Sequence, residues 1–365
     1  MSWFIYCRCW PDFEGFWHIP RSILRWICQK LRERCSLLVK VFRFLMGRRG
    51  RVDPEGGEPP GGRLRDEEDD DFDSEEYRVK STDELFCGYD STWETEEDSG
   101  YTFNNRRRPA ASRYKIKFSR FENAAKDMQN YRHNYPSQTR PDRWIGPVND
   151  DMPNLNFYLG KTASKPDGVY IHIFHNEWHG RYEELEYVHT YIQWLFPLKE
   201  PGMNSEASPL TKEEVEGFLQ NSTAKGNLLK SYQLMLDFYG IELCDERTGK
   251  VQRARNWRDR FNNLNSHTHN SLRITRILKC QGTLGYSHYQ APLVQFFLEE
   301  TLVKGELPNV KDSVLNYFVF AVLDKKERRR LIKFAYLNYD HKDEFVWCPK
   351  KIQMMWSKAA SSRTE

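Results

Sequence analysis

Three histidines lie close together in the sequence and could bind a metal ion: His172, His175 and His179. Because His175 and His179 are four residues apart, they would lie on one face of a helix, where two imidazoles can bind zinc. Residues 175–179 read His-Asn-Glu-Trp-His, which is not the His-Glu-x-x-His order of zinc proteases, and no further ligand follows at a suitable spacing. We therefore expect surface and packing histidines, with no metal and no other cofactor.

A second pattern, Gly160-Lys161-Thr162, resembles the end of a phosphate-binding loop. Such a loop needs a glycine five residues before its Gly-Lys-Thr, and here that position is Leu155. Pro166 would also interrupt any helix that followed. The sequence contains no Gly-x-Ser-x-Gly nucleophile motif and no Gly-x-Gly-x-x-Gly dinucleotide motif either. We therefore expect a protein that is not an enzyme.

Residues 325–330 form a dense basic run that contains Lys325, Lys326, Arg328, Arg329 and Arg330. Such a run can be a nuclear-import signal, because its cations pair with acidic grooves on an import carrier. It can also be the solvated face of a helix, since Leu331, Phe334 and Leu337 follow at helical spacing. The two interpretations are compatible. Residues 106–108, three arginines in a segment expected to be flexible, are a second candidate signal.

The middle of the chain is basic, with Trp257 and Phe261 interleaved among Arg253, Arg255, Arg258, Arg260, Arg273, Arg276 and Lys279. Basic and aromatic side chains together can bind nucleic acid, but no recognised binding module is present. A basic face that binds an acidic protein segment, including this chain's own residues 66–76, explains the pattern equally well. Nucleic acid is therefore not an expected partner.

Charge is distributed unevenly along the chain of 365 residues, whose net charge is +3. Residues 1–51 hold eleven basic and three acidic side chains, whereas residues 53–100 hold four basic and nineteen acidic ones. Residues 1–52 have the profile of an amphipathic helix at a membrane surface, and Cys7 and Cys9 are candidate lipidation sites. The alternatives are a helix that packs on the main domain or a segment that does not fold.

Composition and cysteine spacing indicate the kind of cellular compartment in which the protein lies. No apolar run approaches the roughly 20 residues that a membrane-spanning helix needs, and the first residues do not have the basic and then apolar pattern of a secretory signal. The eight cysteines form neither a disulfide framework nor a Cys-x-x-Cys pair, which suits a reducing environment. We expect a cytoplasmic or nuclear protein with peripheral membrane contact through residues 1–52.

Apolar residues at helical spacing predict an all-α domain from residue 113 onward. Thr211 and Glu214 form a capping box, Gly240 ends a helix, and Asn309 can cap another. Residues 169–174 are a short strand or the lead into a helix, and residues 245–249 are a turn. Besides the helix that begins at Thr211, the predicted helices cover residues 118–130, 182–196, 225–239, 256–264, 268–279, 291–303, 310–323 and 325–339.

These elements predict one compact multi-helix domain, residues 113–349. It is preceded by the basic amphipathic segment 1–52 and by an acidic, disordered linker, residues 53–112, in which Asp66 to Asp71 repel one another. Residues 350–365 are predicted to be a flexible tail.

Several segments resemble the conserved domain of the opioid growth factor receptor family. The longest, residues 189–204, reads His-Thr-Tyr-Ile-Gln-Trp-Leu-Phe-Pro-Leu-Lys-Glu-Pro-Gly-Met-Asn. Residues 90–94, Asp-Ser-Thr-Trp-Glu, resemble the short acidic motif that precedes this domain. The other matching segments, in order, are residues 131–136, 154–158, 165–168, 238–241, 260–265, 269–279, 291–294 and 345–347.

The resemblance implies a non-enzymatic receptor for an enkephalin-type opioid peptide, Met-enkephalin, that restrains cell proliferation and is associated with the nuclear envelope and nucleus. It supplies no ligand-binding residues. The terminal amine of the peptide would need an acidic partner, for which Glu183, Glu184 and Glu186 are candidates. The alternative is an interaction scaffold, nuclear or membrane-associated, whose basic helical face binds acidic protein or nucleic acid.

Overall fold

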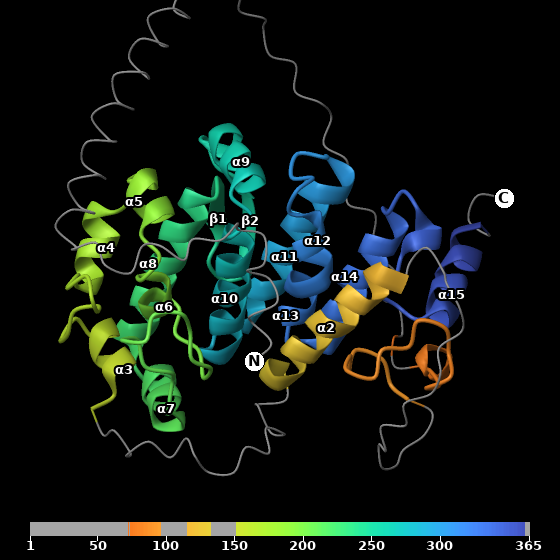
Figure 1. The fold of residues 1–365 in the computed structure, drawn as a ribbon, viewed down its shortest axis with the longest axis horizontal. Coiled ribbons are helices and arrows are strands. Elements are labelled where there is room, and N and C mark those ends of the chain that lie inside the picture. Colours follow the sequence, from red (N-terminus) through yellow and green to blue (C-terminus); the bar gives the residue numbers. More distant parts are fainter. Residues whose placement is uncertain (1–71, 73, 96–114, 133–150, 362–365) are drawn as a thin grey trace, which may run out of the picture. The chain divides into compact units, whose positions relative to one another are not determined.

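A computed structural model describes residues 72, 74–95, 115–132 and 151–361 (Figure 1). They belong to one compact unit that covers residues 70–365. Helices dominate, and the one sheet of these described residues is an antiparallel hairpin of β1 (Ile241–Asp245) and β2 (Lys250–Arg253). The predicted all-α class is confirmed. The hairpin was missed, although residues 245–249 form its predicted turn.

The helices follow one another along the chain. The first are α2 (Lys115–Arg132), α3 (Pro153–Tyr158), α4 (Ile171–Glu177), α5 (Tyr182–Tyr187), α6 (Ile192–Leu195), α7 (Lys212–Gln220) and α8 (Ser222–Phe238). After the hairpin come α9 (Trp257–Ser266), α10 (Asn270–Thr283), α11 (Gln290–Leu298), α12 (Lys311–Ser313), α13 (Val319–Ala321), α14 (Lys325–Leu337) and α15 (Lys350–Ser361). Shorter turns are the 3-10 helices η2 (Glu75–Tyr77), η3 (Ser287–Tyr289) and η6 (Lys342–Glu344), and the π-helices η4 (Glu299–Val303) and η5 (Val314–Phe318).

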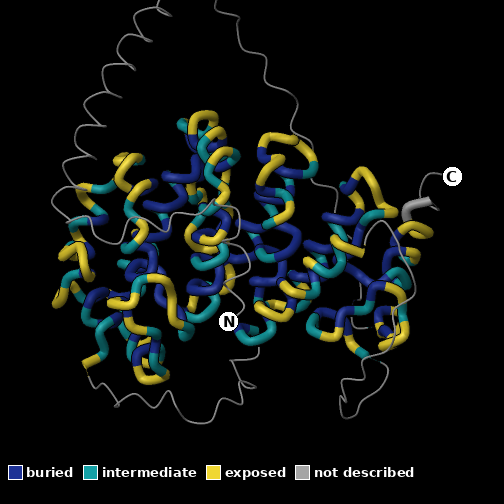
Figure 2. The backbone as a smooth tube through the Cα atoms, viewed as in Figure 1, coloured by how far each residue is buried: buried dark blue, intermediate teal, exposed yellow. Residues whose placement is uncertain are grey.

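One hydrophobic core joins these helices, and the buried residues line their inner sides (Figure 2). The central helix α10 buries Ile274, Ile277 and Leu278 between its neighbours. Aromatic rings extend the core from α11 into η5, where Phe297 and Phe318 lie 5.3 Å apart in an edge-to-face contact. The core is therefore assembled from helices that are distant in the sequence.

Several helix ends form as the sequence predicts. Thr211 and Glu214 make the predicted capping box at the start of α7. Asn221 caps α8 by accepting a hydrogen bond from the amide of Ala224. The helix stops before Gly240, whose φ of +77° is a left-handed conformation that favours glycine. Residues 169–174 lead into a helix, because α4 begins at Ile171.

The prediction of one helix over residues 182–196 is wrong. The chain leaves helical geometry at Val188, whose ψ is 129°, and re-enters it at Ile192. Arg273 explains the interruption, because its guanidinium donates hydrogen bonds to the backbone carbonyls of Leu185, Glu186 and Val188. A buried arginine from a distant helix thus takes the carbonyls that a continuous helix would use.

Two other predicted helices contain π-helical turns. The helix predicted over residues 291–303 continues from α11 into η4, and the one over residues 310–323 contains η5 between α12 and α13. The predicted cap by Asn309 is wrong, since Val310 occupies the cap position and the Asn309 side chain donates to the carbonyl of Asn265. Local sequence favours helix in both regions but does not reveal its exact hydrogen-bond register.

The predicted ends of the domain also need correction. Residues 350–361 are not a flexible tail but form α15, which buries Ile352 and Trp356. Within the predicted linker, residues 72 and 74–95 pack against the domain and bury Phe72, Tyr77 and Trp93. We call these residues the strap. Aromatic side chains in this acidic region offset its charge by contributing buried apolar area.

Candidate functional site

The basic run occupies the first six residues of α14, whose N-terminus is capped by the side chain of Asp324. The five basic residues do not share one environment. Lys326 is exposed, Arg330 pairs with Glu327 at 2.8 Å, and Lys325 pairs with Glu94 of the strap. Arg328 and Arg329, by contrast, are buried, with exposed fractions of 3% and 1%. The run is therefore partly surface and partly interior.

The two buried arginines bind the strap. Arg328 donates from Nε to Oγ1 of Thr92 at 2.8 Å, and from Nη1 to the carbonyl of Val322 at 2.7 Å. Arg329 donates from Nε to the carbonyl of Thr92 at 2.8 Å and from Nη1 to the carbonyl of Phe72 at 2.7 Å. Burial, with nearby Arg132, lowers the pKa of Arg328 to about 9. These hydrogen bonds compensate much of the cost of removing two charges from water.

The Asp-Ser-Thr-Trp-Glu motif supplies the strap's side of this contact. Asp90 accepts hydrogen bonds from the amide and hydroxyl of Thr92 and forms a buried ion pair with Arg132 at 3.2 Å. Glu94 lies 3.6 Å from Arg329, and the hydrogen bond from Lys325, with the Arg329 charge, lowers its pKa. Sequence reasoning noted both the acidic motif and the basic run. It did not bring them together, although their opposite charges were a signal.

Trp93 anchors the motif in an aromatic cluster. Its ring stacks on Tyr77, with centroids 6.2 Å apart, and lies 5.9 Å from the ring of Trp356 in α15. Arg329 lies over the same indole at 5.6 Å. The strap therefore contacts both α14 and α15 through one tryptophan, and such a contact combines apolar burial with a cation–π interaction.

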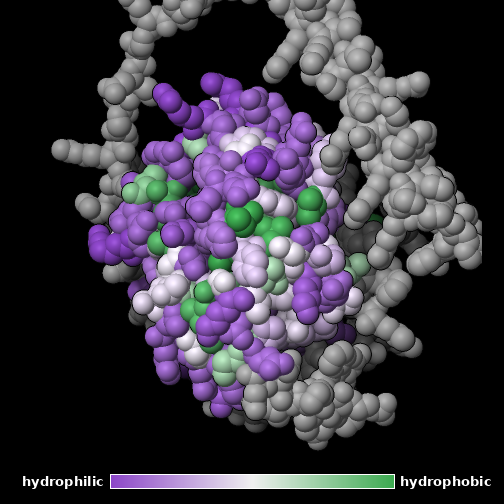
Figure 3. Space-filling view, turned by 90° about the vertical axis from the view of Figure 1, so that its left-hand side faces the viewer, coloured by the Kyte–Doolittle hydropathy of each residue, from purple (hydrophilic) through white to green (hydrophobic). Residues whose placement is uncertain are grey.

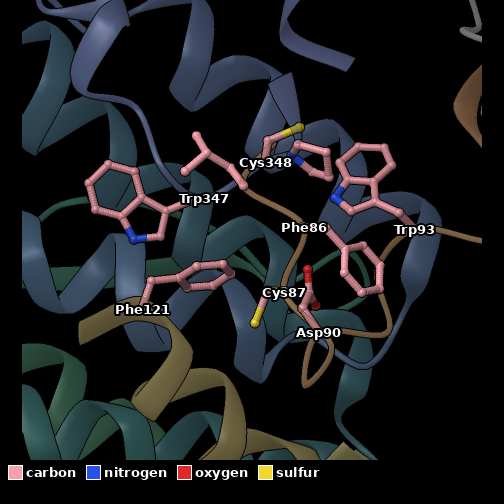
Figure 4. A pocket seen from close by; sticks show the side chains of 9 residues that line it. Phe86, Cys87, Asp90, Trp93, Phe121, Trp347 and Cys348 are labelled. Atoms are coloured by element: carbon pink, nitrogen blue, oxygen red, sulfur yellow. The ribbon is translucent and has the colours of Figure 1, made fainter. Parts of the chain in front are cut away.

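A small cavity lies beneath the strap, where strap side chains face α2 and residues 347–348 (Figure 4). Its volume is about 10 Å³, which is room for about one water molecule. The next cavity, between α8, α10 and α11, has the same volume. Neither can hold a peptide.

The three histidines of residues 172–179 have separate surroundings. Helix α4 ends at Glu177, so His179 lies beyond it, 3.9 Å from Asp237, while His172 is exposed. His175 points inward, and its Nε2 lies 2.9 Å from Oγ of Ser231. Among the described residues, no group of three or more His, Cys, Asp or Glu is arranged to hold a metal ion.

We expect His175 to make stability depend on pH. Burial lowers its pKa to about 4, with Lys230 and His172 adding to the shift, so between pH 4 and about 6.5 the unfolded chain binds more protons than the folded one. Stability should therefore fall as the pH falls through that range, by about 1 kcal/mol at pH 5 after allowing for partial exposure. Urea unfolding should show a smaller loss of stability between pH 7.5 and pH 5 for His175→Gln.

The matched control is His341→Gln, which replaces an exposed histidine. It should keep the pH dependence of the unchanged chain. If His175→Gln unfolds with the same pH dependence as the unchanged chain, His175 is not the group that senses pH in this range.

The basic residues in the middle of the domain are largely internal. Arg260, Arg273 and Lys279 are buried, and Arg276 donates to the carbonyl of Phe196 at 2.7 Å. Arg253 forms a bidentate pair with the buried carboxylate of Glu300, at 2.9 and 2.6 Å. Only two of the seven, Arg255 and Arg258, are exposed. The basic face expected for a nucleic-acid or acidic-protein scaffold is thus mostly used to hold the fold together.

Gly160-Lys161-Thr162 follows the end of α3 instead of preceding a helix. Gly160 has a φ of +70° and serves as the turn after the helix. A phosphate-binding loop needs the amides of a helix N-terminus. The position of these residues is therefore that of a helix end.

The three carboxylates proposed for a peptide amine differ in their availability. Glu183 and Glu184 are exposed on α5, whereas Glu186 is buried. The carboxylate of Glu186 accepts hydrogen bonds from Asn263 at 2.6 Å and Asn270 at 3.2 Å, and these bonds lower its pKa against the effect of burial. Because the carboxylate of Glu186 is buried and already hydrogen-bonded, only those of Glu183 and Glu184 are available to a ligand from solvent.

The family match covers most of the described helices. The sequence family described as the opioid growth factor receptor (OGFr) conserved region matches residues 148–353, more than half of the chain. The chain belongs to the opioid growth factor receptor family. The resemblance inferred from the sequence motifs is thereby confirmed.

Family members share about half of the residues in the matched region. The mouse opioid growth factor receptor is 51% identical over 241 residues, which cover 66% of this chain and 37% of the relative. The human protein is 49% identical over 67% of this chain and 35% of its own length. The rat opioid growth factor receptor-like protein 1 is 48% identical over 66% of this chain and 51% of its own length.

The chain thus spans between about a third and a half of the length of these relatives. No solved structure is significantly similar to it. None of the described helices is both long and apolar enough to span a membrane. The candidate lipidation sites Cys7 and Cys9, residues 1–52 and the second basic signal at residues 106–108 lie outside the described residues.

Proposed function

We propose that this chain is a non-enzymatic receptor for an enkephalin-type opioid peptide, Met-enkephalin, and that it restrains cell growth. The supporting observation is that the chain shares 49–52% identity with proteins named opioid growth factor receptor, and that the family's conserved region matches residues 148–353. The relatives are receptors by name, and the chain covers only part of each of them. Peptide binding by this domain is therefore a proposal, which binding measurements can test directly.

A surface site on α5 fits the chemistry of such a peptide. Figure 3 looks onto the side of the domain where α3, α4 and α5 lie, and there apolar patches are set in a mostly polar surface. On α5, Tyr187 is 76% exposed and lies four residues after the exposed Glu183, so the two share one face of the helix. A carboxylate beside an exposed ring could hold the terminal amine and an aromatic side chain of the peptide.

The test is the affinity of the full chain for Met-enkephalin after Glu183 and Glu184 are both replaced by Gln. We expect binding to weaken about tenfold, the loss of about 1.4 kcal/mol that follows when a charged partner is removed from an exposed amine. The matched control is Glu213→Gln with Glu216→Gln on α7, which removes two charges from another helix. If the α5 double variant binds Met-enkephalin as tightly as the unchanged chain does, this site on α5 is excluded. The receptor proposal itself would stand in that case, because the chain still binds the peptide.

We also propose that the chain acts in the nucleus or at the nuclear envelope, imported by a carrier that binds Lys325, Lys326, Arg328, Arg329 and Arg330. The run has five cations within six positions, interrupted by Glu327, and Lys326 is exposed. Peripheral membrane contact through residues 1–52, strengthened by lipidation at Cys7 and Cys9, is a further proposal. Fluorescent fusions of the unchanged chain and of a Cys7→Ser, Cys9→Ser variant would show whether the membrane-bound fraction depends on these thiols.

A further inference from the structure

We propose that the strap is a displaceable cover over the basic run of α14, and that an import carrier reaches this run only after the strap has moved away. The inference rests on the proposal that the run is an import signal. The carrier is defined by its chemistry, as a protein whose acidic groove pairs with closely spaced Lys and Arg side chains. The strap and the carrier would then compete for the same cations.

The first argument is that the strap occupies the groups that a carrier needs. Of the five basic side chains, Lys325, Arg328 and Arg329 all contact strap residues. Both arginines are buried and donate their Nε hydrogens to Thr92. A carrier that recognises guanidinium groups in its own groove cannot reach these two while Thr92 binds them.

The second argument is that the strap offers the chemistry of such a groove. Acidic Glu94 lies against Lys325 and Arg329, as a carrier carboxylate would. The indole of Trp93 lies beneath the Arg329 guanidinium, so charge and aromatic contact are combined. Asp90 is held by the buried Arg132 and fixes the hydroxyl of Thr92 in place to accept from Arg328. The motif is thus an internal substitute for an acidic, aromatic binding surface.

The third argument is that the cover can open without unfolding the domain core. The strap is joined to the domain mostly by side-chain contacts, with one backbone hydrogen bond from the amide of Lys350 to the carbonyl of Glu84, and its β-bridge between Val79 and Thr95 lies within the strap itself. Glu94 at its end is 56% exposed. The basic run is the beginning of α14, and helix ends fray more readily than helix centres. Opening therefore breaks the contacts of the strap with α2, α14 and α15, including the burial of Trp93 and the Asp90–Arg132 ion pair, in a local unfolding step.

The experiment measures binding of a purified import carrier to the full chain and to a free peptide of residues 323–332. We expect the peptide to bind and the unchanged chain to bind at least about tenfold more weakly, because only its open fraction is competent. The double variant Thr92→Val, Glu94→Gln should open the strap and recover most of that difference. Its matched control is Thr82→Val, Glu76→Gln, which makes the same chemical changes at exposed strap residues and should bind like the unchanged chain.

Hydrogen exchange measures the opening of the strap in the absence of the carrier. The amide of Val79, which donates to the carbonyl of Glu94 at 2.8 Å, should exchange at least about tenfold faster in the Thr92→Val, Glu94→Gln variant, while amides of α8 and α10 remain protected. Slow exchange of the Val79 amide in that variant would show that Thr92 and Glu94 do not hold the strap against α14. Fast exchange without tighter carrier binding would overturn the masking of the run.

The peptide separates the two proposals. If the free peptide does not bind the carrier, the run is not an import signal and there is nothing for the strap to mask. If the peptide and the unchanged chain bind equally well, the run is an import signal that the strap leaves accessible, and only the masking proposal fails.

Discussion

Replacing Arg273 by Ala is expected to destabilise the domain by about 4 kcal/mol, a large share of the stability of a typical domain. Arg273 is buried and crosses from α10 to the break between α5 and α6. It donates to the carbonyls of Leu185, Glu186 and Val188 at 2.7, 3.1 and 3.1 Å. Removing the guanidinium takes this donor from the carbonyls of Glu186 and Val188, whereas the carbonyl of Leu185 keeps a hydrogen bond from the Tyr191 hydroxyl at 2.9 Å. Urea unfolding measures the loss.

A graded series distinguishes the hydrogen bonds from the packing of the side chain. Arg273→Lys should lose about 2 kcal/mol, because an ammonium group keeps the charge but not the planar, five-donor geometry. The matched control Arg255→Ala removes an exposed arginine and should change stability by less than about 0.5 kcal/mol. If Arg273→Ala costs no more than Arg255→Ala, the account of the break between α5 and α6 is wrong.

Replacing Glu214 by Ala is expected to cost about 3 kcal/mol, because this one carboxylate serves two helix ends. It is fully buried. Its oxygens accept from the amide of Thr211 at the start of α7 at 3.2 Å, and from the amide of Asn154 at the start of α3 at 2.7 Å. The side-chain amide of Asn154 donates to it as well, at 3.0 Å. Without it, buried amides at both helix ends lose their acceptor.

The measurement is again the free energy of unfolding, and Glu216→Ala on the same helix is the matched control. Glu216 is largely exposed and has a long, 3.8 Å contact with Lys212, so its removal should cost less than about 0.5 kcal/mol. Glu214→Gln should fall between the two, since an amide keeps one acceptor oxygen but turns a donor toward donors. A loss below about 1 kcal/mol for Glu214→Ala would show that α3 and α7 are fixed by other contacts.

The sequence was sufficient where local rules decide the structure. The capping box at Thr211 could be predicted because both partners lie within four residues. The turn at Gly240 could be predicted because a left-handed backbone conformation favours glycine. The helical class itself followed from periodic apolar residues. These features depend on neighbours in the chain, and single-sequence reasoning can assess them.

Contacts between distant residues decided what the sequence did not predict. The residues near Val188 do not predict the break between α5 and α6. The side chain that donates hydrogen bonds to the carbonyls there, Arg273, lies 85 positions later in the sequence. The contact of Arg329 with the carbonyl of Thr92 spans 237 positions. The basic run was therefore interpreted as a solvent-facing signal, whereas two of its arginines are interior groups. The acidic linker was interpreted as extended, although its aromatic residues pack on α15.

The conserved region of the family can be placed on the helices of the structure. The region matched by the family, residues 148–353, contains α3 to α14 and most of the hydrophobic core. The strap lies before that region, and it contacts Arg328 and Arg329 inside it. The proposals for peptide binding and for import therefore concern different parts of the domain, α5 and α14. They can succeed or fail separately.

The most direct test of the receptor proposal is calorimetric titration of the full chain with Met-enkephalin, with a scrambled peptide of the same composition as the control. The account predicts saturable binding of the true sequence, no binding of the scrambled one, and a loss of affinity when Glu183 and Glu184 are both replaced by Gln. A chain that unfolds cooperatively, and so is folded, but shows no saturable heat with Met-enkephalin would contradict the proposal that this helical domain is the peptide receptor.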